Sequence, residues 1–195
     1  MASSTYTNKT VDVSVKSDTT TLRGKSVVVT GGASGFGENH TRAFAPAGAF
    51  VTIGDINEDR GRKLVAELGC NAQLVKIDAT CWEDQVQMFK QTVAKSSAKS
   101  VDIVVVNAGI AGPHEIFALE APRCLAIVDA DPASEPTKPT LLMLKLNLIG
   151  SIYTFKLAQH YLRLHPQTPS RDRCIIIKGS VAAYLDQPGS FLYQT

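Results

Sequence analysis

The segment TGGASGFG, which runs from Thr30 to Gly37, has the residue types and spacing of a site that binds phosphate groups. Gly31, Gly35 and Gly37 form a G-x-x-x-G-x-G pattern between a predicted strand and a predicted helix. Glycine allows positive φ angles and lets a pyrophosphate approach the backbone closely. The free N–H groups and the dipole at the start of the helix would then stabilise the phosphates. The pattern predicts a dinucleotide-binding turn; the alternative is a turn that only packs the helix on the strand.

Asp55 is a candidate for binding the sugar of such a dinucleotide, because it ends the second predicted strand eighteen residues after Gly37. Dinucleotide-binding folds place an acidic residue near this position, where it hydrogen-bonds the ribose hydroxyls of the adenosine. A carboxylate would repel the additional phosphate of NADP, and Ala33 and Ser34 provide no cation that would bind it. The pattern favours NAD over NADP, although aspartate is also common in turns such as the one before Asn57.

Strands and helices alternate along the chain around these residues. Short apolar stretches predict five strands, at residues 25–31, 50–55, 72–78, 101–109 and 174–179. Helical spacing of apolar residues predicts helices at 36–49, 58–69, 82–96 and 140–165, the first of them ended or kinked by Pro46. This alternation predicts an α/β fold of the Rossmann type, with a doubly wound parallel sheet in a single domain.

Several local features refine this prediction. We expect residues 1–23 to be a flexible N-terminal arm and residues 24–195 to form the dinucleotide-binding domain. Asn57 and Gly69 are expected to cap the second helix at its two ends. Residues 111–140 contain five prolines and are predicted to be mostly loop. The helix at 140–165 is apolar nearly all round, which predicts that it is well buried.

Composition excludes several classes of function. The net charge of +2 is too small to suggest a nucleic-acid or anionic-membrane partner. No apolar run approaches the ~20 residues needed to cross a bilayer, and the polar first twenty residues are unlike a signal peptide. We therefore expect a cytoplasmic protein. The four cysteines form no C-x-x-C pair, the histidines lack the spacing of metal ligands, and no metal site is expected.

The chain resembles the short-chain dehydrogenase/reductase family over about residues 24–195, through six features that occur in the order and on the elements typical of that family. They are the turn Thr30-Gly31-x-x-x-Gly35-x-Gly37, Asp78 in KIDAT, the segment Asn107-Ala108-Gly109, Asn147 in KLNLIG, Ser180 and Tyr193. The stretch VTIGDINEDRG is similar, more loosely, to the NAD-dependent branch that includes 15-hydroxyprostaglandin dehydrogenase. Lys178 matches no residue of the family's site and is predicted to be a strand-end charge.

The resemblance implies an NAD-dependent oxidoreductase that transfers hydride between the cofactor and a secondary alcohol or ketone of a small molecule, a reaction that suits a metabolite biosynthetic pathway. It implies catalysis by Asn147, Ser180 and Tyr193, and cofactor contacts at Thr30, Gly31, Ser34, Gly35, Phe36, Gly37, Asp55, Ile56, Asp78, Ala79, Asn107, Ala108, Gly109 and Tyr193. In the family the tyrosine exchanges the proton, the serine orients the substrate oxygen, and the helix asparagine helps to hold a water that relays the proton.

The family pattern also has a lysine four residues after the tyrosine, and the printed sequence ends two residues after Tyr193. A phenol alone is a poor base near pH 7 because its pKa is too high. In the family, the charge of this lysine lowers the pKa of the tyrosine. We therefore expect a C-terminally truncated domain that contains five of the family's usual seven strands. A homo-oligomer is expected to lack part of the family's usual dimer interface. The 195-residue chain is expected to bind NAD weakly and to oxidise alcohols poorly. The alternatives are a dinucleotide-binding or interaction protein without catalysis, and a remnant without function.

Overall fold

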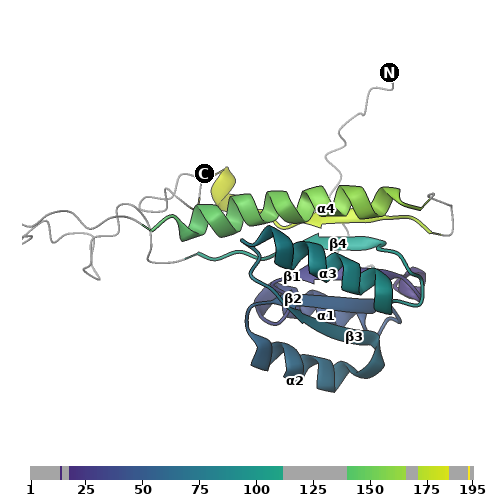
Figure 1. Ribbon diagram of the computed structural model, residues 1–195. Helices are drawn as coiled ribbons and strands as arrows, with labels where there is room; N and C mark the ends of the chain where they lie inside the picture. Colours follow the sequence, from purple (N-terminus) through teal and green to yellow (C-terminus); the bar gives the residue numbers. More distant parts are fainter. Residues whose placement is uncertain (1–13, 15–17, 112–139, 166–170, 185–192, 194–195) are drawn as a thin grey trace, which may run out of the picture.

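Five parallel strands form a single sheet in the computed structural model, which describes residue 14, residues 18–111, 140–165 and 171–184, and residue 193. The order across the sheet is β3-β2-β1-β4-β5 (Figure 1). The strands are β1 Ser26–Thr30, β2 Phe50–Asp55, β3 Ala72–Lys76, β4 Ile103–Val106 and β5 Cys174–Ile177. The predicted α/β fold of the Rossmann type is thus confirmed. Most of the predicted loop at 111–140 lies outside the described residues.

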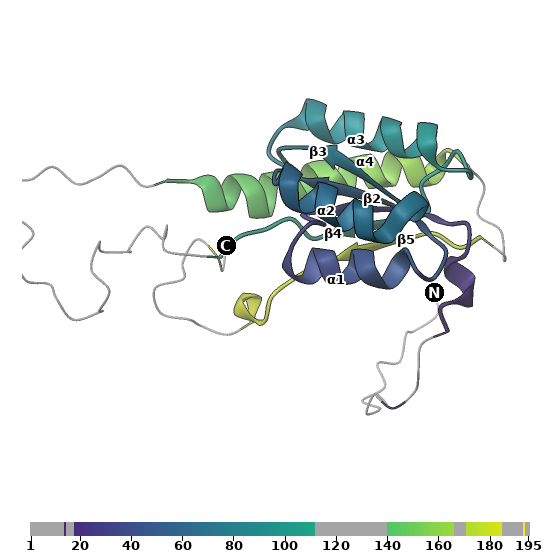
Figure 2. The same ribbon diagram turned by 90° about the horizontal axis from the view of Figure 1, so that it is seen from below.

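Helices cover both faces of this sheet. The α-helices of the described residues are α1 Gly35–Phe44, α2 Glu58–Leu68, α3 Trp82–Lys95 and α4 Ser151–Arg163. A π-helical stretch, Leu144–Gly150, precedes α4, and short 3-10 helices occur at Thr20–Leu22, Gly69–Asn71 and Val181–Ala183. Figures 1 and 2 show α1 and α2 on one face of the sheet and α3 and α4 on the other. The layers are therefore those of a doubly wound sheet.

The ends of the first two helices follow the signals in the sequence. Helix α1 ends at Phe44, two residues before Pro46, which cannot continue the hydrogen-bonding pattern. The Oδ1 atom of Asn57 accepts a hydrogen bond from the N–H of Arg60 at 3.0 Å and caps α2. Gly69 ends α2 with φ +68°, a conformation that glycine adopts without strain. These local predictions are confirmed.

Two separate cores hold the layers together. Val27 and Val29 of β1 point to the face covered by α1 and α2, where they pack with Ile53 and Leu64. Val28 points to the opposite face. There it joins a second core whose other members include Val75, Met88, Phe89, Val104, Leu157 and Ala158. Because β1 is buried on both faces, its sequence is continuously apolar and not alternating, as is usual for a central parallel strand.

The prediction that the helix at 140–165 is well buried is wrong. Only one side of α4 packs on the sheet and on α3, through Thr154, Leu157 and Ala158. Apolar residues on other sides of the helix are exposed, among them Leu148 (46% exposed) and Ile152 (54% exposed). An apolar sequence all round a helix predicts burial only where other elements are present to cover it, and the described residues cover one side.

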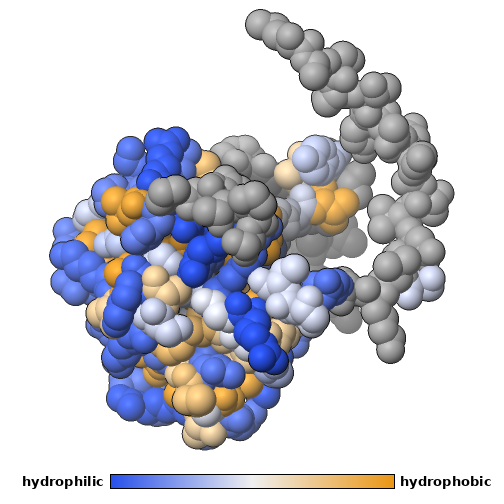
Figure 3. Space-filling view, turned by 90° about the vertical axis from the view of Figure 1, so that its right-hand side faces the viewer, coloured by the Kyte–Doolittle hydropathy of each residue, from blue (hydrophilic) through white to orange (hydrophobic). Residues whose placement is uncertain are grey.

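The amino ends of β1 and β4 and the segment before β5 are joined by one buried carboxylate. Asp102 is fully buried and accepts hydrogen bonds from the N–H of Ser26 (2.9 Å) and from Nε and Nη2 of Arg171 (2.8 and 2.6 Å). Burial alone would raise the pKa of Asp102, but these hydrogen bonds and the nearby arginine charges hold it below its usual value. Figure 3 views this end of the molecule, where hydrophilic surface surrounds smaller apolar patches.

Replacing Asp102 by asparagine should lower the free energy of unfolding by about 2–4 kcal/mol at pH 7, because Arg171 loses its ionic partner and the buried acceptors are rearranged. The depressed pKa means that this contribution is complete above the unfolded-state value, about pH 4. It is lost as the pH falls from there through the folded-state pKa. Urea unfolding at pH 7 and below pH 4 measures both effects, and the gap between parent and variant should narrow in acid.

Asp172→Asn is the matched control, because Asp172 is exposed and pairs with Lys25 at the same end of the sheet. It should cost less stability than Asp102→Asn at pH 7. An Asp102→Asn protein as stable as the parent would contradict the role given to this carboxylate.

Candidate functional site

The carboxyl ends of β1 and β4 lie side by side and form the centre of the candidate site. The chain passes outward from β1 through β2 to β3 and then returns to β4 on the other side of β1. The loops that follow β1 and β4 consequently diverge. This topological switch point is where ligands bind in open α/β sheets.

The glycine turn between β1 and α1 is packed tightly against the end of β4. Gly31 and Gly35 both have positive φ, +63° and +52°. A Cβ atom on Gly31 would lie 3.0 Å from Cα of Ala108, and one on Gly37 would lie 2.0 Å from the carbonyl oxygen of Gly31. A Cβ on Gly35 would meet no atom within 4 Å. At Gly31 and Gly37 the turn packs against protein atoms, and at Gly35 it is open to solvent. The open side forms a cradle, in which a pyrophosphate could approach the backbone closely.

Hydrogen bonds between Thr30 and Asn107 join the ends of β1 and β4. The Oγ1 atom of Thr30 accepts the N–H groups of Asn107 (3.1 Å) and Ala108 (3.2 Å). The Nδ2 group of Asn107 donates to the carbonyl oxygens of Thr30 (2.9 Å) and Gly31 (3.1 Å). These four hydrogen bonds fix the glycine turn relative to the segment Asn107-Ala108-Gly109 and so determine the shape of the cradle.

Asp55 lies at the end of β2 beside the glycine turn. Its Oδ2 atom accepts the N–H of Ala33 at 2.9 Å, and its Oδ1 atom accepts the N–H of Asn57 at 2.9 Å. The side chains of Ser34 and Phe36 in the glycine turn, and of Ile56 directly after Asp55, are exposed. Asp55 is therefore more than a turn aspartate, because its carboxylate also holds the glycine turn against β2.

The loop after β3 contains Asp78 and Ala79. The Oδ1 atom of Asp78 accepts the N–H and the hydroxyl of Thr80, both at 2.8 Å, and the residue is exposed. The side chain of Gln85, fully buried in α3, donates to the carbonyl oxygens of Ala79 (2.6 Å) and Gly150 (3.0 Å). Gln85 thus joins this loop to the end of the π-helical stretch.

Sequence analysis did not identify Gln85, although a signal was present. Its position is three and four residues before Met88 and Phe89, which places a polar side chain on the buried face of α3. Thr154 completes the link by donating its hydroxyl to Oε1 of Gln85 at 2.7 Å. A buried glutamine at such a position must find partners across an interface.

Asn147 lies in the π-helical stretch Leu144–Gly150 and forms a pair of hydrogen bonds with one backbone residue. Its Oδ1 atom accepts the N–H of Ile110 at 2.9 Å, and its Nδ2 group donates to the carbonyl oxygen of Ile110 at 2.8 Å. A Cβ on Gly109 would lie 3.2 Å from Oδ1 of Asn147. The helix asparagine therefore lies directly against the chain that leaves β4. Such π-helical turns are frequent at functional sites.

A cavity of about 360 Å³ opens between these elements. Its wall contains all three predicted catalytic residues, Asn147, Ser180 and Tyr193. The segment Asn107-Ala108-Gly109, Met143, Leu144, Leu148 and Lys178 are also in the wall. Ser180 is the N-cap of the 3-10 helix Val181–Ala183, where its Oγ atom accepts the N–H of Ala182 at 3.2 Å.

The other predicted cofactor residues lie outside the wall of this cavity, along the carboxyl ends of β1, β2 and β3. They are Thr30, Gly31, Ser34, Gly35, Phe36, Gly37, Asp55, Ile56, Asp78 and Ala79. An elongated ligand could therefore lie across the strand ends with one end in the cavity. Among the described residues, no group of three histidine, cysteine or acidic side chains is placed to hold a metal ion. The same residues include no helix of the length and apolar character that crosses a membrane.

Comparison with known protein families gives one family whose model matches the chain. Residues 25–194 match the model described as short chain dehydrogenase. That range includes every residue of the candidate site described above.

Curated relatives agree with this match. The chain is 36% identical over 184 residues to 5'-hydroxyaverantin dehydrogenase of Dothistroma septosporum, and the match covers 88% of the chain and 57% of the relative. It is 34% identical to 5'-hydroxyaverantin dehydrogenase of Emericella nidulans, covering 90% of the chain and 58% of the relative. It is 32% identical to an NADP-dependent dehydrogenase of Cochliobolus lunatus, covering 88% of the chain and 60% of that protein. The chain thus spans less than two thirds of the length of these relatives.

Proposed function

The chain belongs to the short-chain dehydrogenase/reductase family, and we propose that it binds NAD in preference to NADP and acts in hydride transfer between this cofactor and a secondary alcohol or ketone of a small molecule. The observation that carries the proposal is the cavity at the switch point, which brings Asn147, Ser180 and Tyr193 together beside the end of β4. The family membership supports an oxidoreductase with a nicotinamide cofactor.

The residues at the strand ends fit such a cofactor. The cradle at Gly35 is open and lies at the start of α1, whose N–H groups would bind the pyrophosphate. Asp55 would hold the adenosine ribose, and the loop at Asp78 and Ala79 would border the adenine. The segment Asn107-Ala108-Gly109 would lie along the part of the cofactor that enters the cavity. When bound, the nicotinamide ring supplies or accepts the hydride.

The cavity residues would then orient the substrate and move a proton. We assign to Tyr193 the exchange of a proton with the substrate oxygen, because this residue lies in the cavity wall and carries a phenol group. Ser180 would orient and stabilise the same oxygen through its hydroxyl group. Asn147 is held by the backbone of Ile110 and would fix the position of the cavity wall relative to the end of β4. Met143, Leu144 and Leu148 supply apolar wall, which suits a substrate with an apolar carbon skeleton.

The preference for NAD rests on the position of Asp55. One relative bears a name that calls it NADP-dependent, so family membership leaves the choice of cofactor open. In this chain the carboxylate of Asp55 is held beside the glycine turn by the N–H of Ala33, at 2.9 Å. A negative charge fixed there accepts hydrogen bonds from ribose hydroxyls and repels a 2′-phosphate.

Asp55→Ala should raise the Kd for NAD⁺ by about tenfold or more, since a charge-assisted hydrogen bond contributes roughly 1.5–3 kcal/mol. The Kd for NADP⁺ should change far less or fall, because the repulsion is removed together with the hydrogen bond. Calorimetric titration of the full chain with both cofactors measures the two ratios. Asp55→Asn is the matched control, because it removes the charge while retaining one oxygen that can accept the N–H of Ala33. An equal loss of affinity for NAD⁺ and NADP⁺ would overturn the NAD assignment.

A further inference from the structure

Lys178 is a cation in the cavity wall that the proposed mechanism does not use. It directly follows β5, and its backbone N–H donates to the carbonyl oxygen of Val106 at 3.0 Å, which fixes its position beside β4. Its side chain is exposed and reaches toward the glycine turn, where Nζ lies 5.5 Å from the centre of the Phe36 ring. One residue thus connects the end of β5 with the start of α1.

The charge of Lys178 is uncompensated within the described part of the chain. None of the ion pairs found there includes its ammonium group. Glu38, the acidic residue in the first turn of α1, already pairs with Arg42 at 2.8 Å. The ring of Phe36 offers only a weak cation–π contact at an exposed site. The ammonium and the N-terminus of α1 therefore place positive potential on the same side of the strand ends.

We propose that Lys178 is a further cofactor-binding residue, whose ammonium group pairs with the phosphate of the dinucleotide that lies nearer the nicotinamide. The inference rests on the proposed function. Asp55, the expected adenosine contact, is at the end of β2, and β1 and β4 separate it from β5. The phosphate attached to adenosine must lie on the β2 side, and the second phosphate toward β4 and β5, within the reach of Lys178.

Phe36 has a role in this arrangement, because its ring centre lies 5.5 Å from Nζ and the contact favours positions of the ammonium group beside the glycine turn. A lysine left free would lose side-chain entropy on binding. The ring contact restricts that freedom before the ligand arrives. The pair Lys178 and Phe36 therefore acts as a preorganised cation at the nicotinamide end of the cradle.

The test compares the binding of NAD⁺, ADP-ribose and AMP to the full chain by calorimetric titration. Lys178→Met keeps much of the side-chain volume and removes the charge. It should raise the Kd for NAD⁺ and for ADP-ribose by about three- to tenfold, because both contain the second phosphate. AMP has only the phosphate attached to adenosine, and its Kd should stay unchanged. Raising the salt concentration should weaken NAD⁺ binding less in the variant, since one screened ion pair is missing.

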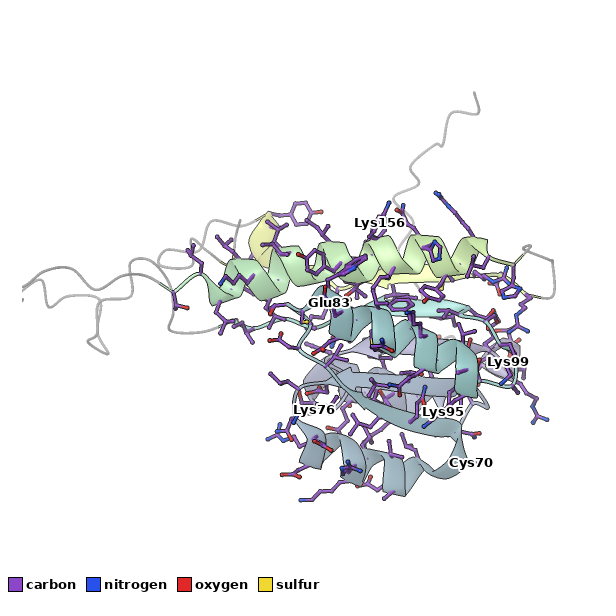
Figure 4. All side chains as sticks on the ribbon, in the orientation of Figure 1. Cys70, Lys76, Glu83, Lys95, Lys99 and Lys156 are labelled. Atoms are coloured by element: carbon purple, nitrogen blue, oxygen red, sulfur yellow. The ribbon has the colours of Figure 1, made fainter. Side chains whose placement is uncertain are left out.

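Two further variants serve as controls. Lys178→Arg keeps the charge and should bind all three ligands nearly as the parent does. Lys95→Met removes an exposed lysine in the last turn of α3, and should change none of the three affinities. Figure 4 shows Lys95 away from the end of the molecule where Lys76 and Glu83 lie, which is the end with the carboxyl termini of the strands.

Each outcome decides between the proposals. If the parent binds NAD⁺ and Lys178→Met binds NAD⁺ and ADP-ribose equally well, Lys178 has no part in cofactor binding, while the proposed function stands. An equal loss for AMP would also refute the inference, because it would show a general effect of charge. A parent that binds neither NAD⁺ nor NADP⁺ would overturn both the proposed function and the role of Lys178.

Discussion

Gly37→Ala is expected to abolish binding of the dinucleotide. The added Cβ would lie 2.0 Å from the carbonyl oxygen of Gly31 and 2.5 Å from Nδ2 of Asn107. Because Gly31 contributes backbone there, the turn itself must move, and the hydrogen bond from Asn107 to Gly31 is lost with it. Losing two charge-assisted hydrogen bonds to phosphate would raise the Kd for NAD⁺ by about a hundredfold or more. The overpacking should also lower stability by about 1–3 kcal/mol.

Two other glycines separate loss of cofactor binding from loss of stability. Gly35→Ala introduces a residue at φ +52°, but its Cβ meets no atom within 4 Å and points into the open side of the cradle. Gly35→Ala should weaken NAD⁺ binding. It should lower the free energy of unfolding only by the cost of placing alanine in the left-handed conformation, about 1–2 kcal/mol. Gly69→Ala places the same kind of strain at the end of α2 and should leave NAD⁺ affinity intact. Normal NAD⁺ binding by Gly37→Ala would show that the turn does not hold the cofactor.

Tyr193→Phe should reduce kcat, by at most about 10²- to 10⁴-fold, the usual contribution of general acid–base catalysis. The ring remains and only the hydroxyl group is removed, so NAD⁺ affinity and stability should change little. Steady-state rates of NADH formation with secondary alcohols measure kcat in the full chain, and cofactor titrations measure its NAD⁺ affinity. Ser180→Ala provides the comparison, because it removes a hydroxyl from the same cavity without removing the proposed proton carrier.

The result for Tyr193 also distinguishes catalysis from cofactor binding alone. A parent that binds NAD⁺ but transfers no hydride with any secondary alcohol or ketone would be a dinucleotide-binding protein. In that case the Tyr193→Phe variant would be indistinguishable from the parent. A catalytic parent whose rate is unchanged in Tyr193→Phe would contradict the assigned role of the phenol.

Much of the fold could be predicted from the sequence because its determinants are local. The β-branched stretches, the caps at Asn57 and Gly69 and the break before Pro46 depend on neighbours along the chain. Alternation of strand and helix then leaves few arrangements, since parallel crossovers have one preferred hand. The residues placed in the site by family resemblance, Asn147, Ser180 and Tyr193, line one cavity in the structure, and their roles stay predictions.

The features that the sequence did not predict depend on distant contacts. Gln85 reaches Gly150, sixty-five residues away, and Arg171 reaches Asp102, sixty-nine residues away. The residues near a buried polar group in the sequence do not indicate which distant group will form a hydrogen bond with it. Lys178 directly follows β5, as the sequence predicts for a strand-end charge, but its proximity to Phe36 could not be predicted, because it arises only when β5 is placed beside β4.

The exposure of α4 has the same origin. Its apolar sequence indicates surface that could be covered, but which side is covered depends on where the other elements lie. In the described residues, the sheet and α3 cover the side that includes Leu157 and Ala158.

Titration of the full chain with NAD⁺ and NADP⁺ is the most direct test of the central claim, that the strand ends around Gly35 and Asp55 form a nicotinamide-dinucleotide site. The account predicts saturable binding of one NAD⁺ per chain, with NAD⁺ bound about tenfold or more tightly than NADP⁺, and loss of that binding in Gly37→Ala. The absence of saturable binding for both dinucleotides, or tighter binding of NADP⁺, would contradict it.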